Sequence, residues 1–203
     1  MQHNSELIDE LPRFPKIKPQ NPTIEWIDKQ GQLVILQNIP EHYRSIFMFL
    51  FETGCRPAEA RALLWSDVDL VNDTVVIRHA FAGCEHRRIT KGKKERVLPL
   101  SAKIKQILES HPKVLRSDFV FHNMNRKPIG QSKLRKLWDK ACKDAKITGI
   151  TLYGGTRHSF ASQKLNEGKS KDLVAEWLGH GDNNTINKYS HVNLEGMRKV
   201  LDD

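Results

Sequence analysis

The apolar residues of this chain recur with a helical period in its first third. They line one side of an amphipathic helix over Thr23–Leu36, and the run Pro40–Phe51 repeats the pattern. Gly54 is placed to end the second helix, because glycine tolerates the left-handed geometry of a helix C-terminus. Pro57 suits the first residue of a third helix that continues to Leu64. The pattern therefore predicts three helices before residue 65.

Short runs of β-branched and apolar residues replace the helical pattern between residues 73 and 100. Polar turns separate them, and the turn over residues 91–94 is basic and contains Gly92. Such runs predict a small antiparallel sheet. Its three predicted strands are Thr74–Ile77, Arg88–Thr90 and Arg96–Leu98.

The helical period returns after the predicted sheet. Ser101 is a suitable N-cap for a helix over residues 102–109, because its hydroxyl can accept a hydrogen bond from the first turn. Further helices are predicted over residues 131–145, 157–166 and 170–178, with a tail helix over about 192–203. The predicted fold class is α+β and mainly α, a helical domain with a small three-stranded antiparallel sheet.

The first 22 residues differ from the rest of the chain. Four prolines between residues 11 and 22 predict an extended arm or linker instead of a packed element. We expect residues 23–203 to form the folded part, within the size range of one large or two small domains. A linker at the start also indicates an N-terminal domain that this chain lacks.

The composition excludes several classes of protein. No stretch of about 18 apolar residues could cross a bilayer, and the polar N-terminus does not resemble a signal peptide. Cys55, Cys84 and Cys142 are odd in number and far apart, which favours reduced thiols and a cytoplasmic location. Cys84 and His86 lack a second ligand pair at zinc spacing, so no metal site is expected.

Positive charge is concentrated in two segments. Lys and Arg number 33 against 24 Asp and Glu, a formal net charge of +9, and the excess gathers over residues 86–103 and 126–146. Such clusters favour a polyanion, although they can also be a solubilising surface. The basic residues expected to contact such a polyanion are Arg87, Arg88, Lys93, Lys94, Arg96, Lys133, Arg135 and Lys136.

Two arginines lie where an anion could bind. Arg56 is expected at a helix cap, where its charge adds to the positive end of the helix dipole unless an anion is bound. Glu59, one turn on, could orient Arg56, or the two could form only a surface pair. Arg157 follows Gly154-Gly155-Thr156 and is expected to open another helix. Two guanidinium groups can grip one phosphodiester through paired hydrogen bonds.

The remaining candidate residues could cleave such a phosphodiester. A lysine of the basic turn, Lys91, Lys93 or Lys94, has an ordinary pKa of about 10.4 and could protonate a departing alkoxide. Tyr189 could attack phosphorus once positive charge or a base helps its phenol to ionise. His180, nine residues before Tyr189, could contact the phosphate oxygen.

The chain resembles the tyrosine recombinases, the phage-integrase family, over residues 40–192. Each motif is short, but four occur in the family's order. They are Thr-Gly-Cys-Arg-Pro-Ala-Glu-Ala, Thr-Lys-Gly-Lys-Lys-Glu-Arg-Val-Leu-Pro-Leu, Thr-Arg-His-Ser-Phe-Ala, and Leu-Gly-His with Tyr nine residues later.

The resemblance implies a DNA-breaking and rejoining fold and an enzyme of site-specific recombination, integration or excision, encoded by a phage or another mobile element. It implies a C-shaped clamp on duplex DNA, a monomer alone and a tetramer on DNA, and cleavage through a 3′-phosphotyrosine without a cofactor. By resemblance, Arg56 and Arg157 clamp the phosphate, and Lys91 is the general acid. His180 binds the phosphate, and Tyr189 is the nucleophile.

One position departs from the family pattern. The family usually has histidine three residues before the second arginine, where this chain has Gly154. Tyr153 or a water could fill the space, His158 could substitute, or catalysis could be slower by about 10²–10⁴-fold. A DNA-binding accessory protein without the chemistry, and a relaxing enzyme like a type IB topoisomerase, are the alternative functions.

Overall fold

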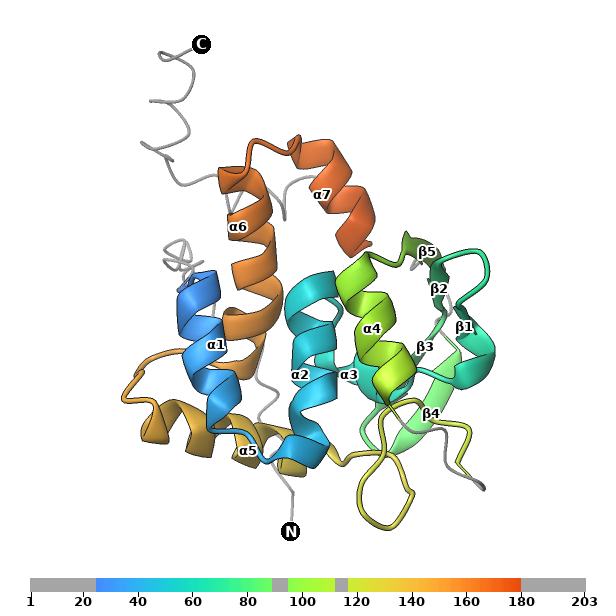
Figure 1. Cartoon of the computed structure of the whole chain (residues 1–203), viewed down its shortest axis with the longest axis horizontal. Coiled ribbons are helices and arrows are strands. Elements are labelled where there is room, and N and C mark those ends of the chain that lie inside the picture. The colour runs from blue at the N-terminus through green and yellow to red at the C-terminus, as the bar shows by residue number, and fades with distance from the viewer. Residues whose placement is uncertain (1–24, 89–94, 112–116, 180–203) are drawn as a thin grey trace, which may run out of the picture.

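A computed structural model of the chain describes residues 25–88, 95–111 and 117–179 (Figure 1). The predicted arm over residues 1–22, the tail helix, and the positions Lys91, Lys93, Lys94, His180 and Tyr189 lie outside these ranges.

The described part is mostly helical, which confirms the predicted fold class. Its helices are α1 (Lys29–Gln37), α2 (Glu41–Thr53), α3 (Pro57–Arg61), α4 (Ala102–Ser110), α5 (Gln131–Asp144), α6 (Ser159–Asn166) and α7 (Lys171–Leu178). A 3₁₀ turn, η1, spans Trp65–Asp67, and a π-helical turn, η2, spans Gly154–His158. No described helix combines the length and apolarity needed to cross a membrane.

Helix α2 is the centre of the core. Its residues Ile46, Phe47, Phe49 and Leu50 are fully buried, and the helix packs against α1, α3, α4 and α6. Figure 1 shows it upright between α1 and α4, with α5 across its lower end and α7 near its upper end. As predicted, Gly54 ends this helix in the left-handed conformation, with φ of 62°.

The sheet differs from the prediction. Strand β2 (Thr74–Ile77) pairs antiparallel with β5 (Arg96–Pro99), and the third strand is β1 (Val68–Asp69). Strands β3 (His79–Ala82) and β4 (Glu85–Arg88) form a separate hairpin around Gly83, which has φ of 62°. The prediction that Arg88 belongs to the three-stranded sheet is therefore wrong, because it pairs with His79 of β3; the rest of that predicted strand lies outside the described residues.

Close packing fixes the distance between η2 and α5. A Cβ on Gly155 would lie 2.2 Å from the indole ring of Trp138, a fully buried residue of α5. The Trp138 indole also donates a hydrogen bond of 3.0 Å to the Ile150 carbonyl. The glycine and the indole together hold η2, and with it Arg157, at the end of α2.

Candidate active site

Arg157 is fully buried and spans the ends of two helices. Its Nη1 donates to the Gly54 carbonyl at 3.0 Å, and its Nη2 donates to the Leu178 carbonyl at 2.7 Å. These carbonyls belong to the C-terminal ends of α2 and α7, where the helix dipole is negative and the last carbonyls have no partner within the helix. Arg157 therefore locks α6, α2 and α7 together.

The prediction that Arg157 opens a helix is wrong. The helical backbone is continuous over residues 152–166, and Arg157 lies within its π-helical turn. The extra residue of a π turn redirects the side chains around it, and such turns are frequent at functional sites. Arg157 is thus placed by this turn and by its two carbonyl partners, not by a helix N-terminus.

Arg157 also carries a buried donor atom, its Nε, with no hydrogen-bond partner in the described part of the chain. A buried donor without an acceptor costs about 1–3 kcal/mol. Burial also lowers the pKa of Arg157, and the nearby charges of Arg56 and Arg96 lower it further. An added anion would relieve both penalties.

Arg56, Glu59 and Arg96 form a second cluster beside Arg157. As predicted, Arg56 caps a helix, and Glu59 lies one turn into it. The Glu59 carboxylate accepts a hydrogen bond from the Arg56 backbone at 2.9 Å and another from its Nη1 at 3.0 Å. Arg96 donates to both oxygens of the same carboxylate, at 2.6 and 3.3 Å. Glu59 is 3% exposed and Arg56 is 26% exposed, so the pair is partly buried and is not the surface pair that the sequence also allowed.

The cluster contains more positively charged groups than negatively charged ones. Burial opposes ionisation of Glu59, but the hydrogen bonds and charge of Arg96, followed by those of Arg56, outweigh it and hold the pKa of Glu59 at about 2. The carboxylate is therefore charged at neutral pH. Arg56 and Arg96 both pair with this carboxylate, and Arg157 interacts electrostatically with all three residues. The described cluster thus carries excess positive charge and is suited to binding an anion.

Gly154 faces the segment before α1. A Cβ at this position would lie 3.2 Å from the Glu25 carbonyl and from the Thr151 hydroxyl, so a larger residue needs these neighbours to move. Tyr153 lies close enough to Arg157 to interact with it electrostatically. Its ring also meets His158 edge-on, with centroids 4.8 Å apart. Tyr153 and His158 are the two residues that could substitute for the missing histidine. Both lie beside Arg157, and their rings contact each other.

Burial lowers the pKa of His158, and the charge of Arg157 lowers it further. A histidine with a lowered pKa stays neutral at neutral pH, so it can accept or donate one hydrogen bond without adding charge to the cluster.

The other predicted DNA-binding residues fall into two groups. Arg87 and Arg88 on β4 are exposed, and Lys133, Arg135 and Lys136 lie on the exposed side of α5. These five are accessible to a large ligand, although Arg87 pairs with Glu85, Arg88 with Glu95, and Arg135 with Asp139.

Arg96 differs from these five residues, because its side chain is 9% exposed and both its terminal nitrogens bond Glu59. Sequence reasoning missed its place in the site. The alternation of side chains along β5 could have revealed it. Arg96 lies two residues before the buried Leu98, so both side chains are on the same face of the strand.

These elements form a mainly helical domain with a cluster of arginines around one buried carboxylate at the C-terminal end of its central helix. The chain belongs to the phage integrase family, whose sequence model matches residues 25–195.

Curated relatives match along most of the chain. It is 29% identical over 201 residues to tyrosine recombinase XerC of Pediococcus pentosaceus, covering 94% of this chain and 62% of that protein. It is 28% identical over 206 residues to tyrosine recombinase XerD of Halalkalibacterium halodurans, covering 94% of this chain and 63% of that protein. The chain thus spans less than two thirds of the length of these relatives.

Solved structures share the fold. XerA recombinase matches with a TM-score of 0.70 at 21% identity, over 93% of this chain and 66% of that one. A lambda integrase dimer bound to a COC′ core site matches with a TM-score of 0.66 at 16% identity, over 82% of this chain and 48% of that one. The observed arrangement of helices and small sheets is therefore that of recombinase structures.

Proposed function

We propose that this chain is the catalytic domain of a site-specific tyrosine recombinase, which breaks and rejoins duplex DNA through a 3′-phosphotyrosine. The observation that carries the proposal is the arginine cluster around the Glu59 carboxylate, together with the buried Nε of Arg157, which has no hydrogen-bond partner among the described residues. Such a cluster suits a phosphodiester, whose charge and acceptor oxygens would satisfy it. The names of the curated relatives support the same activity.

In the proposed reaction, Tyr189 attacks the phosphorus of one strand. The bond from the phenolic oxygen to phosphorus forms as the bond from phosphorus to the 5′ oxygen breaks. The phenol gives its proton to solvent water, and Lys91 gives one to the departing 5′ oxygen. Arg56, Arg157 and His180 stabilise the charge that develops on the non-bridging oxygens. The phosphotyrosine preserves a phosphoester, so rejoining by a 5′ hydroxyl needs no nucleotide or metal.

The proposed partner is duplex DNA, with a tetramer assembling on it in the bacterial cytoplasm. The exposed basic residues of β4 and α5 are the proposed contacts with the phosphate backbone, and Lys93 and Lys94 are further proposed contacts. Phosphate contacts of this kind position a protein on DNA without reading its sequence.

Covalent trapping tests the proposal. A pool of nicked duplexes of random sequence is incubated with the chain, and DNA that stays attached under denaturing conditions is sequenced. A nick close to the cleaved bond lets the freed 5′ end diffuse away and leaves the phosphotyrosine. We expect wild type to trap DNA and Tyr189→Phe to trap none while still binding the duplex. An adduct that persists in Tyr189→Phe would overturn the assignment of the nucleophile.

Gly154 favours a second candidate, a DNA-binding accessory protein without cleavage, because glycine supplies no proton donor where the family has histidine. The same assay separates the two: binding of the pool without any adduct from wild type identifies the accessory function. Relaxation of a supercoiled plasmid without a specific site would instead identify a topoisomerase-like activity.

A further inference from the structure

Arg96 occupies a junction between three parts of the site. It is the first residue of β5, the strand that follows the segment containing Lys91. Its guanidinium reaches α3 and holds Glu59 through two hydrogen bonds of 2.6 and 3.3 Å. Its side chain also lies against Gly179, where an added Cβ would stand 3.2 Å from Cδ and from Nη1 of Arg96.

The contact with Glu59 links Arg96 to the phosphate clamp. The same two carboxylate oxygens that accept from Arg96 also accept from the backbone and Nη1 of Arg56. Glu59 is almost fully buried. If Arg96 were replaced, the Glu59 carboxylate would lose two hydrogen bonds and would have to rotate toward another donor. That rotation would move the guanidinium of Arg56, which is the freer partner at 26% exposed.

The contact with Gly179 links Arg96 to a second part of the site. Gly179 ends α7 in the left-handed conformation, with φ of 65°, and His180 is the next residue. The preceding carbonyl, that of Leu178, accepts from Arg157. Arg157 thus hydrogen-bonds the backbone at the end of α7, just before Gly179. The side chain of Arg96 packs against Gly179 itself.

We propose that Arg96 is a positioning residue for the cleavage reaction, acting through Glu59 on Arg56 and through Gly179 on the turn before His180. The inference rests on the proposed recombinase function. A competing role is direct contact with a DNA phosphate through its Nε, which is buried without a partner in the described ranges. The two roles predict different kinetics.

The test compares four variants with wild type on one duplex enriched by the trapping assay. The variants are Arg96→Met, Arg96→Lys, Glu59→Gln and the double variant Arg96→Met with Glu59→Gln. Arg44→Met is the matched control, because Arg44 is also a partly buried arginine, but it bonds the Ile39 carbonyl at the opposite end of α2. Equilibrium binding and the rate of covalent complex formation at saturating DNA are measured separately.

A positioning role predicts a loss of rate without a loss of affinity. We expect Arg96→Met to form the adduct about 10²-fold more slowly, the usual effect of a small displacement of reacting groups, with an unchanged Kd for DNA. The double variant should lose less rate than the product of the two single losses, because Arg96 and Glu59 share the route to Arg56. Arg96→Lys should be intermediate, since an ammonium keeps the charge but not the planar pair of bonds.

Three outcomes would overturn the inference. A weakened Kd with an unchanged rate at saturation would make Arg96 a DNA ligand. Rate losses that multiply in the double variant would separate Arg96 from Glu59, and a wild-type rate in Arg96→Lys would remove the need for the paired geometry. Circular dichroism and thermal melting check that each variant folds, and if Arg96→Met does not fold, Arg96→Lys decides the question.

The same experiment separates this inference from the proposed function. If wild type forms no adduct with any duplex, the recombinase proposal fails and the role of Arg96 fails with it. If wild type forms the adduct and Arg96→Met matches it in rate, only the role of Arg96 fails.

Discussion

Glu59 accepts four hydrogen bonds within the site, two from the Arg96 guanidinium and two from the backbone and side chain of Arg56. One carboxylate thereby fixes two guanidinium groups that would otherwise repel each other. A neutral amide could not do the same, because it lacks the charge and one of its two terminal groups is a donor. The spacing Arg-x-x-Glu places both residues at the start of one short helix.

Replacing this carboxylate should destabilise the fold in a pH-dependent way. We expect Glu59→Gln to lower the free energy of unfolding by about 3 kcal/mol at pH 7, as for other broken buried ion pairs. The folded-state pKa of Glu59 is lowered from 4.5 to about 2. Its stabilising effect is therefore complete above the unfolded pKa and is lost as the pH falls toward 2. Urea unfolding at pH 7, 4 and 3 measures the difference, and a gap that stays constant over this range would contradict the assignment.

At the scale of elements, several helix ends were predictable and the pairing of strands was not, and α1 begins at Lys29 instead of Thr23. Gly54, Pro57 and Ser101 signal helix ends through local chemistry, and all three act as predicted. Strand pairing depends on contacts distant in sequence, and the β3–β4 hairpin has no clear apolar alternation in His-Ala-Phe-Ala and Glu-His-Arg-Arg.

The site was predictable to a similar degree. Arg56 and its cap followed from local signals, but the π-helical turn at Arg157 has no sequence signature that we could recognise. The pairing of Arg96 with Glu59 joins residues 37 positions apart, so neither propensity nor periodicity could reveal it.

The packing of η2 on α5 gives a prediction at this scale. Gly155→Ala should lower the free energy of unfolding by about 1–3 kcal/mol, because its Cβ would overlap the buried Trp138 ring and force η2 to shift. Since η2 carries Arg157, covalent trapping should also slow. Gly130→Ala is the matched control, because a Cβ there meets nothing within 4 Å, and its cost should stay below about 1 kcal/mol. Equal thermal shifts in the two variants would rule out this packing argument.

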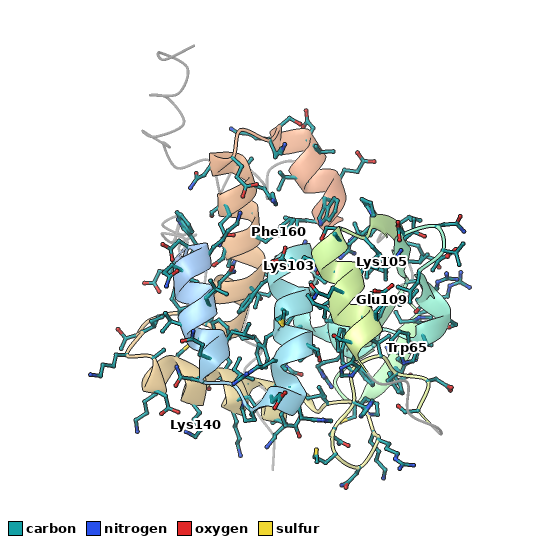
Figure 2. The ribbon with its side chains drawn as sticks, in the orientation of Figure 1. Trp65, Lys103, Lys105, Glu109, Lys140 and Phe160 are labelled. Carbon is teal, nitrogen blue, oxygen red and sulfur yellow. The ribbon has the colours of Figure 1, made fainter. Side chains whose placement is uncertain are left out.

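Across the whole molecule, the arginine cluster and the exposed basic side of α5 lie apart, because η2, which carries Arg157, packs on the buried side of α5 through Gly155 and Trp138. Gly54, at the C-terminal end of α2, accepts from Arg157, while α5 crosses the other end of α2 in Figure 1. Figure 2 shows Lys140 of α5 directed away from the body of the protein. Buried arginines suit one phosphate held tightly, whereas exposed lysines suit many phosphates held loosely. The architecture thus separates the proposed chemistry from the proposed general attraction for DNA.

Because of this separation, we expect the exposed side of α5 to govern the salt dependence of DNA binding but not the rate of cleavage. DNA binding should weaken steeply with salt, and Lys136→Gln should reduce the slope of log K against log salt by about 1, because one phosphate contact is lost. Lys105→Gln should leave the slope unchanged, since Lys105 lies on α4 and is paired with Asp73 at 2.6 Å (Figure 2). The rate of adduct formation at saturating DNA should be the same in both variants and wild type. Fluorescence anisotropy over a salt series measures the slopes, and a slope for Lys136→Gln equal to that of Lys105→Gln would remove α5 from the DNA-binding surface.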